Sequence, residues 1–159
     1  MPNKVLLPFD GSPSSVKAAH YIAREFRNRD ASVLLLNVQQ VYLDAELATM
    51  GRSLMKALHA DGQAALREGV EILDRAGIAH EARIRIGFGP VAKAIALVAK
   101  EAGVGLIVMG TRARHPLVEL ITRAVPARVL RASEVPVVLV KRGARTKTSK
   151  YIEPASIAA

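Results

Sequence analysis

The chain has 159 residues, of which 50% are hydrophobic, and a formal net charge of +9. This length predicts one domain that buries its own core, and the lack of cysteine excludes disulfides, thiolate metal sites and a cysteine nucleophile. No apolar run approaches the ~18 residues of a membrane span, and Pro8 and Asp10 interrupt the first apolar run, so we expect a cytoplasmic protein without a secretory signal or a membrane partner.

The positive charge is not confined to one end of the chain. Residues 142–159 hold four basic residues and one acid, so residues 1–141 still carry a net charge of +6. We interpret 1–141 as the domain and 142–159 as a basic tail, which lacks a core pattern and is expected to be mobile. A positive field favours phosphates and polyanions without specifying one. Nucleic acid binding is therefore one hypothesis, although no aromatic residues are interleaved with the basic ones.

The first half of the domain alternates short apolar runs with helical patterns. Residues 4–9 predict a buried strand, and Ser12 and Pro13 are suited to cap and begin the helix that follows. Residues 31–38 predict a second buried strand. Apolar spacing over residues 47–76 then predicts a long helix, whose glycines indicate an irregular start.

The second half continues the alternation. Residues 80–86 alternate apolar and charged side chains, which predicts a strand at an edge of the sheet. A helix is expected over 91–102 and the next buried strand over 106–109. The last helix should begin just before Pro126, because proline lacks the N–H that an interior helical bond requires. Val137–Lys141 is the last predicted strand.

This order predicts an α/β fold, in which a parallel sheet carries helices on both faces. Ligands of such sheets bind beyond the carboxyl ends of the strands. Asp10 follows the first strand, and the loop that begins at Gly110 brings Arg112 and Arg114, with Arg123 further on, to the end of the fourth. Arginine presents forked donors suited to phosphate. The alternatives are that Asp10 only caps a turn and that the arginines form a solvated loop.

The sequence contains no recognisable catalytic set. The four histidines fall in different predicted elements and lack the spacing of metal ligands. There is neither a Walker phosphate loop nor a GxGxxG after a strand, and the serines near residue 12 lack the context of a nucleophile elbow. Nothing in the sequence therefore argues for an enzyme.

Several segments resemble the universal stress protein family. They are FDGS after the first strand, NV at the end of the second, LIVMGTRAR, and VPARVLRASEVPVVLVK. The resemblance covers residues 3–141 and implies an open five-stranded parallel sheet of strand order 3-2-1-4-5. It also implies a homodimer in which the last strands, Val137–Lys141, of two subunits meet. Many members bind ATP at the strand ends, and others do not.

Members that bind ATP carry a glycine, two residues, a second glycine, nine residues, then a glycine and a serine or threonine. Gly110 matches the first glycine of this motif, whereas Ala113, Arg123 and Ala124 stand in place of the second glycine, the third glycine and the hydroxyl residue. Glycines in phosphate loops permit close backbone approach and positive φ, which alanine and arginine resist. The resemblance thus implies an altered phosphate site.

The nucleoside side of the motif is retained, because Asp10 matches the family's acidic position and Val38 the strand end that meets adenine. The first hypothesis is a non-catalytic stress protein that does not bind ATP in the usual way and works through partners. The alternative is that Arg112, Arg114 and Arg123 replace the missing backbone contacts, so that ATP or another adenine nucleotide still binds.

Overall fold

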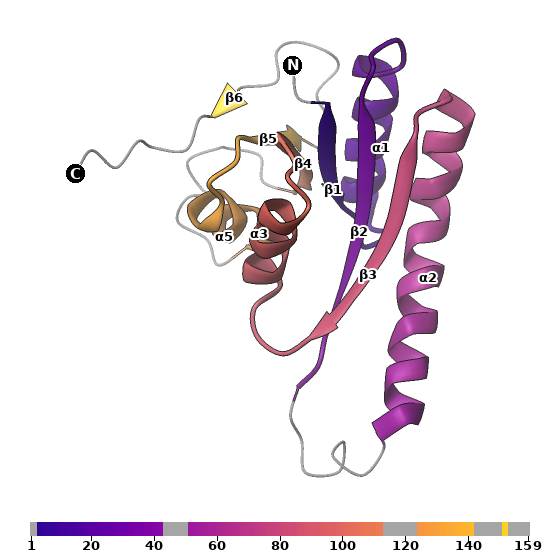
Figure 1. Cartoon of the computed structure of the whole chain (residues 1–159), viewed down its shortest axis with the longest axis vertical. Helices are drawn as coiled ribbons and strands as arrows, with labels where there is room; N and C mark the ends of the chain where they lie inside the picture. The colour runs from indigo at the N-terminus through magenta and orange to yellow at the C-terminus, as the bar shows by residue number, and fades with distance from the viewer. Residues whose placement is uncertain (1–2, 43–50, 113–123, 142–150, 153–159) are drawn as a thin grey trace, which may run out of the picture.

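The computed structural model describes residues 3–42, 51–112, 124–141 and 151–152. Within these ranges the chain alternates strands and helices (Figure 1). In chain order the elements are β1 Lys4–Pro8, α1 Pro13–Glu25, β2 Ser32–Gln40, α2 Gly51–Ala76, β3 His80–Gly87, α3 Val91–Glu101, β4 Leu106–Thr111, α5 Val125–Ala132, β5 Val137–Lys141 and β6 Tyr151–Ile152.

One sheet holds all of the described strands, in the order β3-β2-β1-β4-β5-β6. The first five are parallel, which confirms the predicted α/β class and the strand order 3-2-1-4-5. The predicted edge position of β3 is also correct. The chain runs outward from β1 to β3, then crosses to β4 on the other side of β1. The carboxyl ends of β1 and β4 therefore form the switch point at which open α/β sheets bind ligands.

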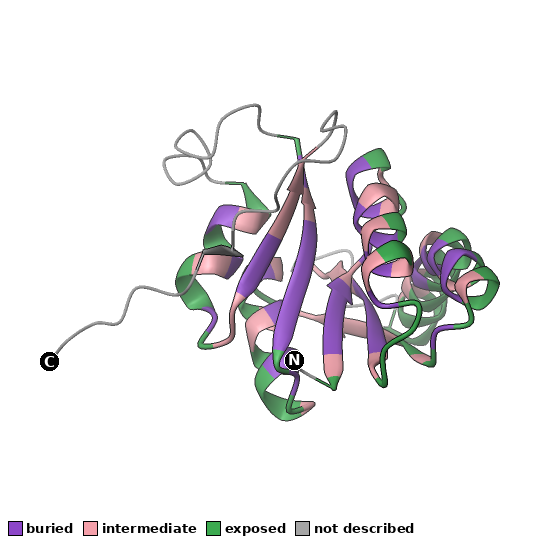
Figure 2. Cartoon of the chain, turned by 90° about the horizontal axis from the view of Figure 1, so that it is seen from above, coloured by how far each residue is buried: buried purple, intermediate pink, exposed green. Residues whose placement is uncertain are grey.

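Helices cover both faces of the sheet. α1 and α2 lie on one face, and α3 and α5 lie on the other (Figure 1). Successive side chains of β1 alternate between the two faces, so Leu7 packs with α1 and α2 while Leu6 packs with α3. Figure 2 shows that buried residues run along the middle strands. The core is thus two apolar layers separated by the sheet. The loops that connect strands and helices lie at the strand ends.

Two helix starts agree with their sequence signals. Ser12 is the N-cap of α1 and accepts a hydrogen bond from the Ser15 N–H, and Pro13 occupies the first turn. α5 begins at Val125, immediately before Pro126, as the proline predicts. Both helices begin at the same end of the strands, beyond their carboxyl ends.

Two glycines of α2 face the sheet and are buried. A Cβ at Gly62 would lie 2.9 Å from Ile84 Cγ2, and one at Gly69 would lie 3.0 Å from Leu35 Cδ2. Their absence of a side chain lets the helix pack closely on β2 and β3. These glycines, which weakened the helical pattern in the sequence, therefore have a packing role. The expected irregular start at residues 47–50 lies outside the described residues.

Two differences from the sequence predictions concern the strands. β2 extends to Gln40, two residues beyond the predicted end, because the edge strand continues to pair with it through Gly87. β6 was not predicted, and it pairs antiparallel with Val137 and Val138. The edge of β5, at which the family resemblance implies pairing with a second subunit, is therefore partly paired within the chain. No helix in the described ranges is both long and apolar enough to cross a membrane.

Candidate ligand-binding cavity at the strand ends

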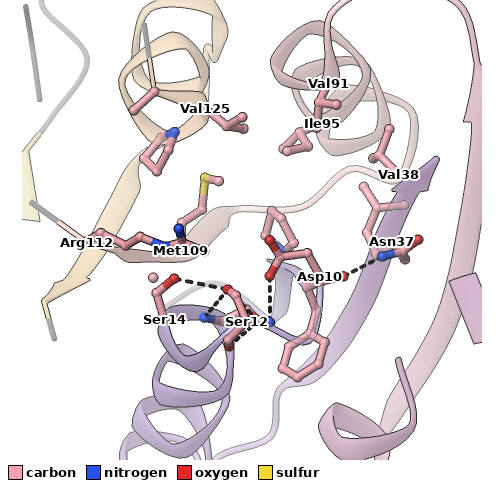
Figure 3. A pocket seen from close by; sticks show the side chains of 17 residues that line it. Asp10, Ser12, Ser14, Asn37, Val38, Val91, Ile95, Met109, Arg112 and Val125 are labelled. Atoms are coloured by element: carbon pink, nitrogen blue, oxygen red, sulfur yellow. Dashed lines mark hydrogen bonds between the residues drawn. The ribbon is translucent and has the colours of Figure 1, made fainter. Parts of the chain in front are cut away.

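A cavity of about 710 Å³ lies at the carboxyl ends of β1, β2 and β4. The first turn of α1 borders it from one face of the sheet, and the starts of α3 and α5 border it from the other (Figure 3). Its volume falls within the range of roughly 300–1,000 Å³ that is typical of small-molecule sites. The cavity therefore coincides with the switch point of the sheet.

Asp10 projects into this cavity from the turn after β1 (Figure 3). Gly11 supplies the turn with a φ of +77°, and the Asp10 Oδ1 accepts a hydrogen bond from the Ser12 N–H at 2.9 Å. Burial by itself would raise the pKa of Asp10, but hydrogen bonds from Ser12 and Ser15 outweigh it and lower the pKa below its usual value. The carboxylate is therefore ionised at neutral pH. Asp10 therefore caps the turn and also faces the cavity.

The serines at the start of α1 form a closed hydrogen-bond network. Ser12 Oγ accepts the Ser15 N–H at 3.3 Å, and Ser15 Oγ donates to the Ser12 carbonyl at 2.9 Å. Ser12 and Ser14 hydroxyls lie 3.1 Å apart. The described residues that line the cavity include no histidine.

Asn37 is a site residue that the sequence analysis missed. It is 3% exposed, donates from Nδ2 to the Phe9 carbonyl at 2.9 Å, and accepts at Oδ1 from Gln39 Nε2 at 2.7 Å. The bond to Phe9 joins β2 to the residue directly before Asp10. The available signal was a single amide inside an otherwise apolar strand, where a buried polar group requires a partner.

An apolar wall faces Asp10 across the cavity. Val38 comes from β2, and Val91 and Ile95 come from the first turns of α3 (Figure 3). Val38 was predicted for the site, whereas the two α3 residues were predicted only as part of a helix face. Their place follows from the parallel topology, because a helix that follows β3 must cross the sheet and one of its ends is adjacent to the strand ends.

Gly110 lines the cavity at the end of β4, but the structure gives it a packing role. A Cβ there would overlap the carbonyl group of Ser14 in the first turn of α1. Gly110 is absent from the described glycines with positive φ. Its lack of a side chain is thus explained by the close approach of α1 to β4, independently of any phosphate. Arg112 follows at the strand end and also lines the cavity.

The start of α5 completes the cavity wall. Ala124 is its N-cap residue and supplies no side-chain hydrogen bond, and Val125 and Pro126 line the cavity beside it. Proline has no N–H group. The first turn of this helix therefore offers fewer hydrogen-bond donors than a turn that begins with serine and contains no proline.

Five of the eight predicted site residues meet at this cavity: Asp10, Val38, Gly110, Arg112 and Ala124. The other three, Ala113, Arg114 and Arg123, lie outside the described residues. No cluster of metal-binding side chains occurs in the described parts of the chain. The described lining residues thus combine one carboxylate, one guanidinium and an apolar wall.

The model of the universal stress protein family matches residues 1–141 of this chain. A curated relative, a universal stress protein of Methanocaldococcus jannaschii, is 30% identical over 144 residues, which cover 87% of this chain and 82% of the relative.

Solved structures share the fold. A universal stress protein family protein from Arabidopsis thaliana, solved with AMP bound, has a TM-score of 0.66 and 24% identity over 90% of this chain and 94% of its own. A universal stress protein in complex with cAMP has a TM-score of 0.65 and 23% identity, covering 88% of this chain and 97% of its own.

Proposed function

The chain belongs to the universal stress protein family, and on this premise we propose that it is a non-catalytic stress-response protein whose cavity binds the nucleoside part of an adenine nucleotide. The observation that carries the proposal is the cavity itself. It joins an apolar wall to an ionised carboxylate at the switch point of the sheet.

The two walls match the two parts of a nucleoside. A base is a flat apolar body, and the wall of Val38, Val91 and Ile95 offers it a surface that excludes water. A ribose presents hydroxyl donors, and the Asp10 carboxylate accepts hydrogen bonds from such donors more strongly than a neutral group would. The AMP and cAMP carried by two structural neighbours support an adenine nucleoside as the ligand.

The same side chains support binding without catalysis. Asp10 is the only carboxylate among the described lining residues, and its lowered pKa makes it a weak proton acceptor at neutral pH. The hydroxyls of Ser12 and Ser15 also form hydrogen bonds within the first turn of α1. This part of the cavity therefore suits a ligand that is held and released unchanged.

We also propose that the protein is a homodimer through β5. β6 pairs with Val137 and Val138 only, so the described pairing leaves Leu139 to Lys141 of this edge available to a second copy. A charge at Val138 would not test this, because Val138 is 4% exposed and packs in the core. Sedimentation of the unaltered chain at micromolar concentration should give a dimer. A monomer at every concentration would contradict the assignment.

Calorimetric titration with adenosine and AMP tests the nucleoside site. We expect micromolar binding to the unaltered chain and affinity at least about tenfold lower for Asp10→Asn, which loses a charged acceptor. Asp30→Asn is the matched control, since it removes the same charge from an exposed residue. Asp30 precedes β2 and lies at the amino ends of the strands, away from the cavity. Absence of binding by adenosine and AMP to folded protein would overturn the proposal.

A further inference from the structure

Basic residues gather on the outer side of α1, opposite the side that packs in the core. Lys17, His20 and Arg24 recur at intervals of three and four residues, which places them on one face of the helix. Arg27 and Arg29 follow in the exposed turn after the helix, and we call these five residues the α1 basic stripe. This turn lies at the amino ends of the strands, away from the cavity (Figure 1). We propose that the stripe binds the phosphate backbone of duplex DNA without reading its sequence.

The stripe is more positive than the neighbouring helix. Residues 17–30 contain four basic and two acidic residues, which gives a net charge of +2 with histidine counted as neutral. α2 contains four basic and four acidic residues, which gives a net charge of zero over its 26 residues. Because both helices cover the same face of the sheet, the difference makes α1 the part of this pair that attracts a polyanion.

Two arginines of the stripe are held in place. Arg24 donates from Nε to Glu25 Oε1 at 2.8 Å, and its Cζ lies 5.7 Å from the centre of the Tyr21 ring. Arg29 donates from Nε to the Glu25 carbonyl at 2.8 Å, and its Cζ lies 5.6 Å from the centre of the Phe26 ring. Since both bonds use Nε, the Nη donors of each guanidinium can still bind a phosphate. An arginine that is already ordered also loses less conformational entropy on binding.

The stripe is long enough to meet several phosphates of one DNA strand. Lys17 and Arg27 are ten residues apart, which corresponds to about 15 Å at the helical rise of about 1.5 Å per residue. Each strand of a duplex carries one charge per about 3.4 Å of its axis, so this length faces about four phosphates. The stripe has four permanent cations, although Glu25 offsets part of the charge of Arg24. A row of cations of this length fits a polymer of phosphates better than a single phosphate group.

The side chains around the stripe favour a duplex over a single strand. Proteins that bind single strands stack the bases on exposed aromatic rings. Here the guanidinium groups of Arg24 and Arg29 cover the rings of Tyr21 and Phe26, and Phe26 is only 6% exposed. The stripe therefore offers charge to a backbone and little aromatic surface to a base.

The same helix is poorly suited to a membrane surface. Helices that lie on membranes bury large apolar side chains among the lipids. None of the exposed large hydrophobic side chains found in the described ranges belongs to α1, because its apolar residues pack in the core. Phosphates of a nucleic acid are thus a better match than those of a bilayer.

Fluorescence anisotropy of the full chain with a labelled duplex of about 20 base pairs tests the proposal, at salt concentrations from about 50 to 200 mM. We expect a Kd on the order of 10 µM at the lowest salt, and a log–log slope of affinity against salt of about −3 to −4, since four cations displace counterions. A second duplex of scrambled sequence should bind within about twofold, because phosphate contacts carry no sequence information.

The triple variant Lys17→Gln, Arg27→Gln, Arg29→Gln tests the location. It should lower the affinity at low salt at least about tenfold and reduce the slope to about −1. Arg27→Gln alone should reduce the slope by about 1. Arg27 forms no hydrogen bond or ion pair with any described residue, so this single variant removes charge without removing a contact within the fold. Thermal melting checks that both variants remain folded.

The matched control is Arg67→Gln, Lys93→Gln, Arg128→Gln, which removes the same charge from exposed positions on three other helices. It should retain the slope and bind within about threefold of the unaltered chain. Equal losses in the two triple variants would assign the binding to overall charge and overturn the proposal, as would no binding at about 50 mM salt. Tighter binding to a single strand of the same length would contradict the duplex as partner. Stripe-dependent binding to anionic phospholipid vesicles without binding to the duplex would contradict it as well.

Discussion

The two sides of the cavity are built differently. On the side formed by β1, α1 and β2, polar side chains are held by each other, as Asp10 accepts from Ser12 and Asn37 donates to Phe9. On the side formed by β4 and α5, Gly110 serves close packing, and Ala124 leaves its helix without a side-chain cap. A retained glycine therefore does not by itself indicate a phosphate site, because here the fold alone requires it.

The largest expected effect comes from Gly110, where a side chain would break the contact between the two sides. Gly110→Ala should lower the free energy of unfolding by about 3 kcal/mol or more, since its Cβ overlaps the Ser14 carbonyl and backbone must move. Gly87→Ala is the matched control, because a Cβ there meets no atom within 4 Å. Urea unfolding measures both, and equal losses would show that Gly110 is not required for packing.

Asn37 tests the side of the cavity that is formed by β1, α1 and β2, where polar side chains bond to each other or to the backbone. Asn37→Leu should reduce the free energy of unfolding by about 1–3 kcal/mol, because it leaves the Phe9 carbonyl without its buried donor. It should also weaken adenosine binding, since the Phe9 carbonyl adjoins Asp10. Gln39→Leu removes the other partner of Asn37 at a less buried position and should have a smaller effect on both. If the two variants behave alike in unfolding and titration, Asn37 does not position Asp10.

The smallest expected effect is the pH dependence that Asp10 contributes. Its pKa is lowered in the folded protein, so its stabilising contribution is present above the unfolded value of about 3.9 and is lost as pH falls through the folded pKa. Asp10→Asn should therefore flatten the acid limb of the stability curve below about pH 4, while Asp30→Asn serves as the control. Unchanged acid unfolding in Asp10→Asn would mean that the Ser12 hydrogen bond does not stabilise the ionised form.

Much of the fold was predictable from the family resemblance and from local sequence signals. The strand order follows from the family resemblance, and the starts of α1 and α5 follow from Ser12 and Pro126. β6 was not predictable, because two residues in a basic segment carry no periodicity and their pairing with β5 depends on tertiary contact.

The site was predictable only in part. Asp10 was identified because it follows the first strand, and Val38 because the family resemblance places it at the strand end that meets adenine. Asn37, which directly precedes Val38 in β2, was missed because neither signal points to it. Ile95 was missed for a different reason, since its spacing indicates a buried helix face and not which part of that face adjoins a cavity. The packing role of Gly110 could not be inferred from sequence, because it depends on the distance between α1 and β4.

Methyl NMR with adenosine tests whether the cavity holds a nucleoside between Asp10 and the apolar wall that faces it. The methyl signals of Val38, Val91 and Ile95 line the proposed base site, and Val16 and Val98 methyls provide controls elsewhere in the fold. We predict that adenosine shifts the first three in a saturable manner and that Asp10→Asn weakens this response. Saturable shifts confined to other methyls, or no shifts at millimolar adenosine, would contradict the account.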